Sequence, residues 1–304
     1  IIEDNVKGFN VVREGYKMPL NNFDITTGFH SLKQLEGFMG SRIKESSVPF
    51  DIDRPLNPEE IKVVIDYCIH DVKQTIEVFD NKQEEFESQL ALIEAFNLNM
   101  SMFTKTKAQL SAFILGAEKH ENRGDEFDLQ FPKTLKVEKY KHIVEWYKDP
   151  ENLDYSKKLK VDVAGVPHIF AWGGLHGAIP KYKDEGIILC CDVASLYPSI
   201  MIEYGYISRN VRDPLKYNEI RDTRLELKRK KDPKQAPYKI VLNSTYGAMK
   251  DQYNPLYDPL MANNVCLAGQ LLLLDLIEKI EPYCKLIQSN TDGLFMKVEK
   301  EADI

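Results

Sequence analysis

The sequence lacks the cysteine patterns and the long apolar runs that mark several protein classes. Its five cysteines include no Cys-x-x-Cys pair and no cysteine–histidine ligand spacing, which argues against a zinc module and a disulfide framework. No stretch approaches the roughly 18 consecutive apolar residues that a membrane helix needs. The main candidate for a membrane segment, around Leu271–Leu274, soon meets Asp275. These absences favour a protein of the reducing cytoplasm that has no membrane partner.

The two ends of the sequence also lack the usual signals. The first residue is Ile1 rather than Met, no charged-then-apolar signal peptide follows it, and the sequence stops at Ile304. We therefore expect a piece of a longer protein. Internal repeats and low-complexity tracts are missing as well, so neither a solenoid nor a biased linker is predicted.

The composition is that of an ordinary globular protein. The 304 residues are 43% hydrophobic and 29% charged, which suits one large domain or two ordinary ones. The net charge of −7 does not by itself indicate a nucleic-acid-binding protein. Net charge governs solubility and long-range steering, however, and a local basic groove is compatible with an acidic chain.

The first 117 residues predict a largely helical domain. A helix is expected from Pro58, because Asn57 is a favourable N-cap and Glu59 and Glu60 suit the positive end of the helix dipole. Apolar residues continue at helical spacing over residues 81–117. We place this first domain at residues 1–117, a polar connector at 118–166 and a second domain at 167–304.

The second domain combines strand and helix signals. The short apolar run Ile187–Cys191 predicts a buried strand. The further predicted elements are three helices at Leu215–Lys231, Pro237–Met249 and Pro259–Ile280, and two strands at Lys285–Ser289 and Leu294–Val298. The predicted fold class is therefore mixed α/β.

Asp192 directly follows the predicted buried strand and opens the segment Asp192–Ile200. A carboxylate in that position is costly unless a metal ion or another cation compensates its charge. The alternative is that Asp192 caps the following helix, which has Pro198 near its start. Taken alone, Asp192 leaves both interpretations open.

A second candidate site lies on the helix expected at Pro237–Met249. Lys239, Asn243 and Tyr246 stand at i, i+4 and i+7 and therefore share one helical face. An ammonium group, an amide and a phenol in one row suit a bound triphosphate and a base pair. Arg224 and Lys228, four apart on the preceding helix, could add two cations. The alternative is a pair of ordinary solvated helices.

A third candidate is the turn Asn290–Gly293 between the last two predicted strands. As local structure it is an ordinary hairpin turn, because Asn, Asp and Gly favour such turns. The functional alternative places Asp292 beside Asp192, where two carboxylates could share divalent ions. Two metal ions about 3.5–4 Å apart can activate a hydroxyl and stabilise a leaving group.

The order of these segments is more informative than any one of them. The patterns Asp-x-x-Ser-Leu-Tyr-Pro-Ser, Lys-x-x-x-Asn-Ser-x-Tyr-Gly and Thr-Asp-Gly follow one another and resemble motifs A, B and C of family B DNA polymerases. The resemblance is strongest over residues 171–298. It implies a polymerase palm with an antiparallel sheet and two antiparallel finger helices at about 215–250, in a chain that stops before the thumb.

The resemblance implies a role for each matched residue. Asp192, Asp292 and the Val193 carbonyl would bind two Mg²⁺ ions, or Mn²⁺ in their place. Ser195 and Leu196 would offer backbone N–H groups to the triphosphate. The catalytic residues implied are Asp192, Asp292 and Lys239.

The remaining matched residues would contact the nucleotide or the base pair. Tyr197 would lie under the deoxyribose and exclude a 2′-hydroxyl. Lys239 would neutralise charge on the leaving phosphates. The other implied contacts are Arg224 and Lys228 to the triphosphate, Asn243 to the nucleotide, and Tyr246, Gly247 and Thr291 to the base pair.

The third motif departs from the family pattern. Family members usually carry Asp-Thr-Asp, whereas this chain has Asn290-Thr291-Asp292. An amide oxygen can still ligate a hard cation, although less strongly than a carboxylate. The second aspartate is the direct metal ligand in the family, so we expect Asn290 to weaken rather than abolish catalysis.

Two further features refine the resemblance. Only 38 residues separate Ile200 from Lys239, which resembles the ordinary primer-using branch more than the protein-primed one. The Trp172-Gly173-Gly174 segment resembles the family's Tyr-x-Gly-Gly linker, but Ala171 stands where Tyr is expected. That difference puts the DNA-clamping role of the linker in doubt.

The N-terminal part resembles the C-terminal part of an RNase H-like 3′–5′ exonuclease domain. Tyr67 and Asp71 fit its Tyr-x-x-x-Asp motif and lie four apart on one helical face. The first exonuclease motif, Asp-x-Glu, is not seen, and Asn22-Phe23-Asp24 is better interpreted as a turn than as the second motif. We therefore expect an inactive exonuclease remnant.

The predicted function is template-directed DNA synthesis in phage or viral DNA replication, in the cytoplasm of an infected bacterial host. The implied partners are primer–template DNA, deoxynucleoside triphosphates and the remaining segments of the same enzyme. Alone, the fragment is expected to be weakly active or inactive. Two alternatives stay open: a catalytically silent DNA-binding fragment and a metal-dependent 3′–5′ exonuclease.

Overall fold

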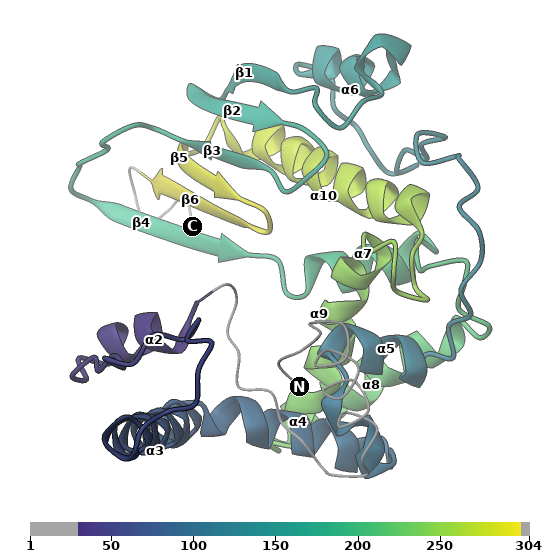
Figure 1. Cartoon of the computed structure of the whole chain (residues 1–304). Helices are drawn as coiled ribbons and strands as arrows, with labels where there is room; N and C mark the ends of the chain where they lie inside the picture. Colours follow the sequence, from purple (N-terminus) through teal and green to yellow (C-terminus); the bar gives the residue numbers. More distant parts are fainter. Residues whose placement is uncertain (1–29, 299–304) are drawn as a thin grey trace. The chain divides into compact units, whose positions relative to one another are not determined.

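A computed structural model describes residues 30–298 of the chain (Figure 1). The chain divides into two compact units, residues 1–105 and 106–304. The sequence placed the end of its first domain at residue 117 instead. The segment Asn22–Asp24 lies outside the described residues.

The described part of the first unit is helical. It contains α2 (Leu32–Phe38), α3 (Pro58–Asp80), α4 (Gln83–Ala95) and the 3₁₀ helix η1 (Met100–Thr104). Helix α3 begins at Pro58 as predicted. The Asn57 side chain accepts a hydrogen bond from the Glu60 N–H, and the Glu60 carboxylate accepts one from the Asn57 N–H. This capping box fixes the start of the helix.

The helical region expected at residues 81–117 is three separate helices. After α4 the chain turns at Asn97, which has a positive φ of 49°, and Asn99 then caps η1. Thr106 caps α5 (Lys107–Ile114), which belongs to the second unit and packs against α9 (Gln235–Met249). Apolar spacing continues across these breaks, so periodicity alone does not reveal them.

The second unit contains a six-stranded, fully antiparallel sheet in the order β1-β2-β3-β5-β6-β4. The strands are β1 (Leu159–Val163), β2 (Val166–Phe170), β3 (His176–Ala178), β4 (Ile187–Asp192), β5 (Lys285–Asn290) and β6 (Gly293–Val298). The fold is thus a mixture of helices and antiparallel sheet. The expected connector 118–166 is partly structured, because it contains α6 (Lys141–Lys148), η2 (Pro150–Asn152) and β1.

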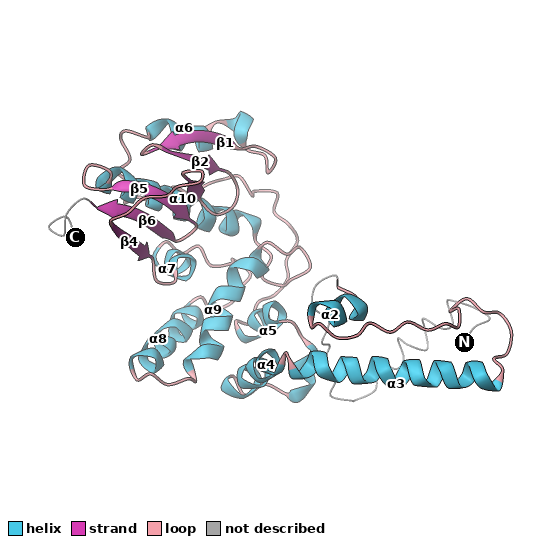
Figure 2. Cartoon of the chain, turned by 90° about the vertical axis from the view of Figure 1, so that its left-hand side faces the viewer, coloured by secondary structure: helices cyan, strands magenta, loops and turns pink. Residues whose placement is uncertain are grey.

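Helices back one face of this sheet (Figures 1 and 2). Along β2, Val166, His168 and Phe170 are buried whereas Pro167 and Ile169 are exposed, which is the alternation of a half-covered sheet. The other helices of the unit are α7 (Leu196–Glu203), α8 (Leu215–Arg229) and α10 (Pro259–Ile280). Helix α8 packs on α9, and α10 packs on α7 and α9.

Helix α10 is the apolar core helix of the unit. Within the described residues it is long and apolar enough to cross a membrane by length and composition, although the sequence has no uninterrupted apolar run of that length. However, 89% of its apolar window is buried inside the structure. A core helix meets the same criteria as a membrane span, and here the sheet and the neighbouring helices cover its apolar surface.

A buried histidine joins three strands beneath the sheet. His168 Nδ1 donates to the Val166 carbonyl at 2.7 Å, and Nε2 then accepts from the Ser289 hydroxyl at 2.8 Å. The ring lies against Gly177, where a Cβ would be 2.4 Å from it. Burial lowers the pKa of His168, so the neutral imidazole is the form that the folded state favours.

The position of His168 predicts a pH dependence of stability. Its pKa is about 6.5 in the unfolded chain and lower in the folded one. The unfolded state therefore takes up the proton first, and stability falls as the pH drops below about 6.5. In urea unfolding at about pH 7.5 and about pH 5.5, His168→Gln should lose less stability between the two pH values than the parent chain. Equal losses would contradict this assignment.

Candidate active site

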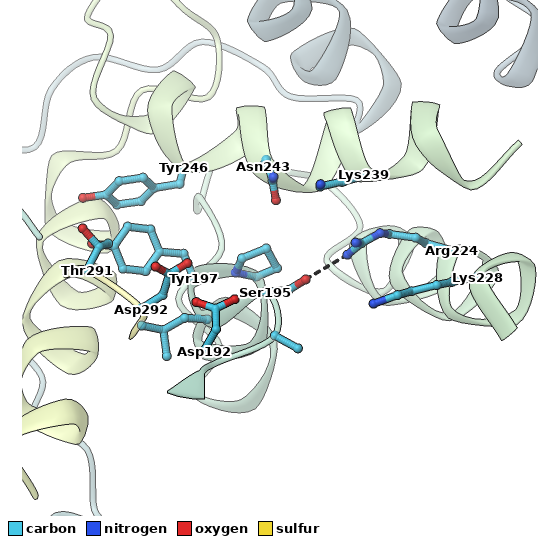
Figure 3. Close-up of a pocket in the computed structure, with 13 residues that line it drawn as sticks. Asp192, Ser195, Tyr197, Arg224, Lys228, Lys239, Asn243, Tyr246, Thr291 and Asp292 are labelled. Carbon is cyan, nitrogen blue, oxygen red and sulfur yellow. Dashed lines mark hydrogen bonds between the residues drawn. The ribbon is translucent and has the colours of Figure 1, made fainter. Parts of the chain in front are cut away.

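The two candidate carboxylates lie at neighbouring ends of paired strands. Strand β4 ends at Asp192, whose register partner on β6 is Gly293. The Val193 N–H donates to the Asp292 carbonyl at 2.8 Å, which ties the residue after β4 to the β5–β6 turn. A Cβ at Gly293 would lie 3.4 Å from Asp192 Oδ1. The sheet therefore holds both carboxylates at one edge (Figure 3).

Both carboxylates line a cavity of about 520 Å³ in the second unit. It is lined by Asp192, Ala194, Ser195, Leu196, Tyr197, Pro198, Arg224, Lys228, Lys239, Asn243, Tyr246, Thr291 and Asp292. Eleven of these thirteen residues are among the site residues predicted from the sequence, and the other two are Ala194 and Pro198. Val193, Gly247 and Asn290 do not line it.

The cationic side chains of the cavity come from two helices, α8 and α9. Helix α9 carries Lys239 and helix α8 carries Arg224 and Lys228 (Figure 3). Arg224 Nη1 donates to Ser195 Oγ at 2.8 Å, so its guanidinium is held in place. Burial lowers the pKa of Arg224, yet an arginine remains charged at neutral pH.

Ser195 has an unusual backbone conformation at the start of α7. It adopts a left-handed conformation with φ of 57° immediately before α7, a conformation that an L-residue with a Cβ adopts only at an energetic cost. Its side chain makes no capping bond to the helix, because the hydroxyl accepts from Arg224 instead. The first backbone N–H groups of α7 are thus left for another acceptor.

Four charged groups of the cavity have no counter-ion among the residues that the structure describes. Among residues 30–298, the side chains of Asp192, Asp292, Lys228 and Lys239 form no ion pair and no hydrogen bond. Two carboxylates on one side and two ammonium groups on the other therefore face the same space. Such an arrangement suits a ligand that carries both divalent cations and phosphate groups.

Two tyrosines form one wall of the cavity. The Tyr197 and Tyr246 rings are 4.4 Å apart between centroids and tilted by 54°. Burial raises the pKa of both phenols, so both are neutral at physiological pH. Gly269 of α10 allows this packing, since a Cβ there would lie 3.0 Å from Tyr197 Cε1.

Hydrogen bonds also fix residues 171–174, a segment outside the three motifs. The carbonyl of Ala171 accepts hydrogen bonds from Tyr147 Oη at 3.0 Å and Gln270 Nε2 at 2.7 Å. The Gly173 carbonyl accepts from the Cys266 thiol, and burial raises the pKa of that thiol to about 11. These partners come from distant parts of the sequence, so no local pattern predicts them.

Gly174 connects this segment to the third motif. The Thr291 N–H donates to the Leu175 carbonyl at 2.7 Å, and a Cβ at Gly174 would lie 2.4 Å from Thr291 Oγ1. Thr291 itself has a positive φ of 39°. Gly174, the second glycine of the pair noted in the sequence, therefore supports the turn that carries Asp292.

The predicted exonuclease residues belong to the first unit. Tyr67 and Asp71 lie on α3, and Asp71 accepts a hydrogen bond from Lys33 Nζ at 2.7 Å. The same ammonium lies 4.9 Å from the centre of the Tyr67 ring. Asp71 thus already has a cation within the chain, unlike Asp192 and Asp292.

The contact between Gly174 and Thr291 gives a test of the site geometry. We expect Gly174→Ala to lower the free energy of unfolding by about 1–3 kcal/mol, because the β-branched Thr291 cannot move away freely. Gly173→Ala is the matched control, since a Cβ there meets nothing within 4 Å, and should change stability by less than about 0.5 kcal/mol.

Urea unfolding of the two single variants measures both values. The double variant Gly174→Ala/Thr291→Ala should recover part of the loss, because it removes the crowded atoms. Equal stability of the two glycine variants would show that Gly174 does not approach Thr291 closely.

Comparison with known proteins gives a distant structural similarity. No protein-family model matches the chain, and no curated protein matches it. The chain is similar to the structure of the family B DNA polymerase from the hyperthermophilic archaeon Pyrobaculum calidifontis, with 17% sequence identity and a TM-score of 0.47. The similarity covers 90% of this chain and 37% of that one, so the chain spans well under half of the polymerase's length. A similarity at this level does not assign a family or an activity.

Proposed function

We propose that the chain is the palm and fingers core of a phage-like, family B type DNA polymerase, which transfers deoxynucleotides onto a primer 3′-hydroxyl. One observation carries the proposal. Asp192 and Asp292, two carboxylates that form no ion pair within residues 30–298, share a cavity with the cations Arg224, Lys228 and Lys239. The order of the three sequence motifs supports the same function independently.

The donor set fits two divalent cations. Asp192 and Asp292 offer carboxylate oxygens to the cavity, and hard cations such as Mg²⁺ prefer oxygen donors. The Val193 carbonyl, which does not line the cavity, is the further ligand that the motif implies. Two bound ions would activate the 3′-hydroxyl and stabilise the leaving pyrophosphate. The paired strands β4 and β6 hold the carboxylates in place before any ligand arrives.

The opposite side of the cavity fits a triphosphate. The start of α7 presents backbone N–H groups at Ser195 and Leu196, and a helix N-terminus favours an anion. Arg224 is already oriented by its bond to Ser195 Oγ. Lys228 and Lys239, which have no counter-ion in the described chain, would neutralise the remaining phosphate charge.

The tyrosine wall fits the sugar and the base pair. Tyr197 is held from behind by Tyr246 and by the close approach of Gly269, so its ring cannot withdraw easily from a bulky 2′-substituent. Asn243 lies between Lys239 and Tyr246 on the cavity face of α9 (Figure 3). In this proposal it contacts the nucleotide, and Tyr246 lies next to the base pair.

The polymerase subdomains follow from these placements. The antiparallel sheet with α7 and α10 would be the palm, and the packed pair α8 and α9 would be the fingers. The Tyr217 hydroxyl donates to the Leu242 carbonyl at 2.8 Å and joins the two finger helices. The first unit would be the C-terminal part of an exonuclease domain. Primer–template DNA and the other segments of the enzyme are the proposed partners.

Primer extension tests the function directly. In single-turnover assays with excess protein, Mg²⁺ and deoxynucleotides, the parent chain should extend a primer slowly. Asp192→Ala should reduce the rate by at least about a thousandfold, because the metal site loses a carboxylate. Extension that persists in Asp192→Ala would refute the proposed site.

The same assay should include Asn290→Asp. Asn290 lies on β5 opposite His176 and does not line the cavity, so the change should alter the rate by less than about tenfold. An inactive parent that Asn290→Asp restores would show that Asn290 belongs to the metal site after all.

Tyr197 gives a test of the sugar contact. Tyr197→Ala should raise the incorporation of ribonucleotides relative to deoxynucleotides by at least about tenfold, because it opens space beside the 2′-position. Tyr204→Phe, in a tyrosine at the other end of α7, should leave the ratio unchanged. Competition between the two nucleotide types in primer extension measures it, and an unaltered ratio in Tyr197→Ala would exclude the steric role.

A further inference from the structure

The first unit holds a group of polar side chains far in sequence from the proposed polymerase cavity. Glu36 lies on α2, and His70 and Asp71 lie on α3, which packs against it. One ligand atom from each of the three residues lies within 4.8 Å of the other two. Two carboxylates and an imidazole therefore converge between these two helices.

The group contains polar atoms that the chain does not satisfy. The Glu36 side chain is 0% exposed, and its Oε2 has no hydrogen-bond partner among the described residues. His70 Nε2, which lies 3.5 Å from that oxygen, is likewise without a hydrogen bond. Buried polar atoms are nearly always paired, so this cluster lacks a partner.

Lys33 does not supply that partner. Its ammonium bonds Glu36 Oε1 at 2.9 Å and Asp71 Oδ1 at 2.7 Å, and thereby holds the two carboxylates together. Glu36 Oε2, on the other side of that carboxylate, faces His70 instead. Lys33 carries one positive charge against two carboxylates, and Glu36 Oε2 has no hydrogen bond among the described residues. That oxygen is therefore open to an added cation.

We propose that Glu36, His70 and Asp71 bind a divalent transition-metal ion such as Zn²⁺. One nitrogen and two carboxylate oxygens match the preferences of Zn²⁺ and Co²⁺ better than those of Mg²⁺. Zn²⁺ bonds such donors at about 2.0–2.2 Å. Side-chain movements of about 1 Å would therefore bring the three ligand atoms within bonding distance of one ion. The ion would join α2 to α3. The proposal does not rest on polymerase activity.

Metal titration of the complete chain tests the site. The protein is first freed of transition metals and then kept in excess Mg²⁺, so that Mg²⁺ competes for the Asp192–Asp292 pair. It is titrated with Zn²⁺ by calorimetry and with Co²⁺ by visible absorption. One Zn²⁺ per chain should bind with a Kd below about 100 µM. His70→Ala and Glu36→Gln should each weaken binding at least about tenfold.

Matched substitutions elsewhere serve as controls. Asp66→Asn changes an exposed carboxylate on the same helix, and His142→Ala removes an exposed histidine of the second unit; both should bind Zn²⁺ as the parent does. Asp292→Ala should also retain Zn²⁺ binding, which separates this site from the proposed polymerase cavity. If Glu36→Gln does not fold, the partly exposed His70 decides the test.

Two results would overturn the proposal. The first is a parent chain that binds no Zn²⁺ in this range, which would leave Glu36 and His70 as an internal pair without a metal. The second is unaltered binding in a folded His70→Ala variant. Neither result depends on whether the chain extends a primer.

Discussion

The proposed active site depends on the antiparallel pairing of β4 with β6. Asp192 is the last residue of β4, and Asp292 directly precedes the first residue of β6. The register Asp192–Gly293 therefore sets the two aspartates side by side. The hydrogen bond from the Val193 N–H to the Asp292 carbonyl extends the pairing past the strand ends. A slip of one residue would turn one carboxylate to the other face of the sheet, and the cavity would lose one of its two acidic residues.

Asp192 and Asp292 repel each other, so the strands and the turn that carry them must be rigid enough to hold them in place. Buried residues of β6 anchor one side, and the contact of Gly174 with Thr291 supports the turn. The Ala171 carbonyl is bonded to Gln270 and Tyr147, so α10 and α6 both reach this segment. The surrounding structure thus fixes two carboxylates for which the described part of the chain provides no counter-ion. Such preorganisation is what the proposed electrostatic catalysis requires.

The carboxylate pairs Glu36–Asp71 and Asp192–Asp292 differ in how their negative charge is compensated. In the first unit, Lys33 compensates part of the charge of Glu36 and Asp71. In the second unit, the cations lie across a cavity from Asp192 and Asp292, at a place where a ligand fits between them. Charge separated by an open cavity indicates ligand binding more clearly than charge neutralised by a direct ion pair.

Much of the site could be predicted from the sequence because its residues lie in short, continuous patterns. Lys239, Asn243 and Tyr246 share a face through helical periodicity, and Asn57 and Pro58 mark the start of α3 through local capping chemistry. The breaks within residues 81–117 and the strand β1 were missed, because the apolar pattern runs on across the helix breaks and β1 gains its stability from pairing with β2.

The sequence by itself determined which residues are candidates for a chemical role and the order in which they occur. Only the tertiary structure decided which of them meet. It brings Asp192 next to Asp292 across a hundred residues of chain, places Arg224 on Ser195, and leaves Val193, Gly247 and Asn290 outside the cavity wall. The reason is physical: helical faces and caps depend on neighbours a few residues away, whereas strand register and buried contacts depend on partners that no local pattern specifies.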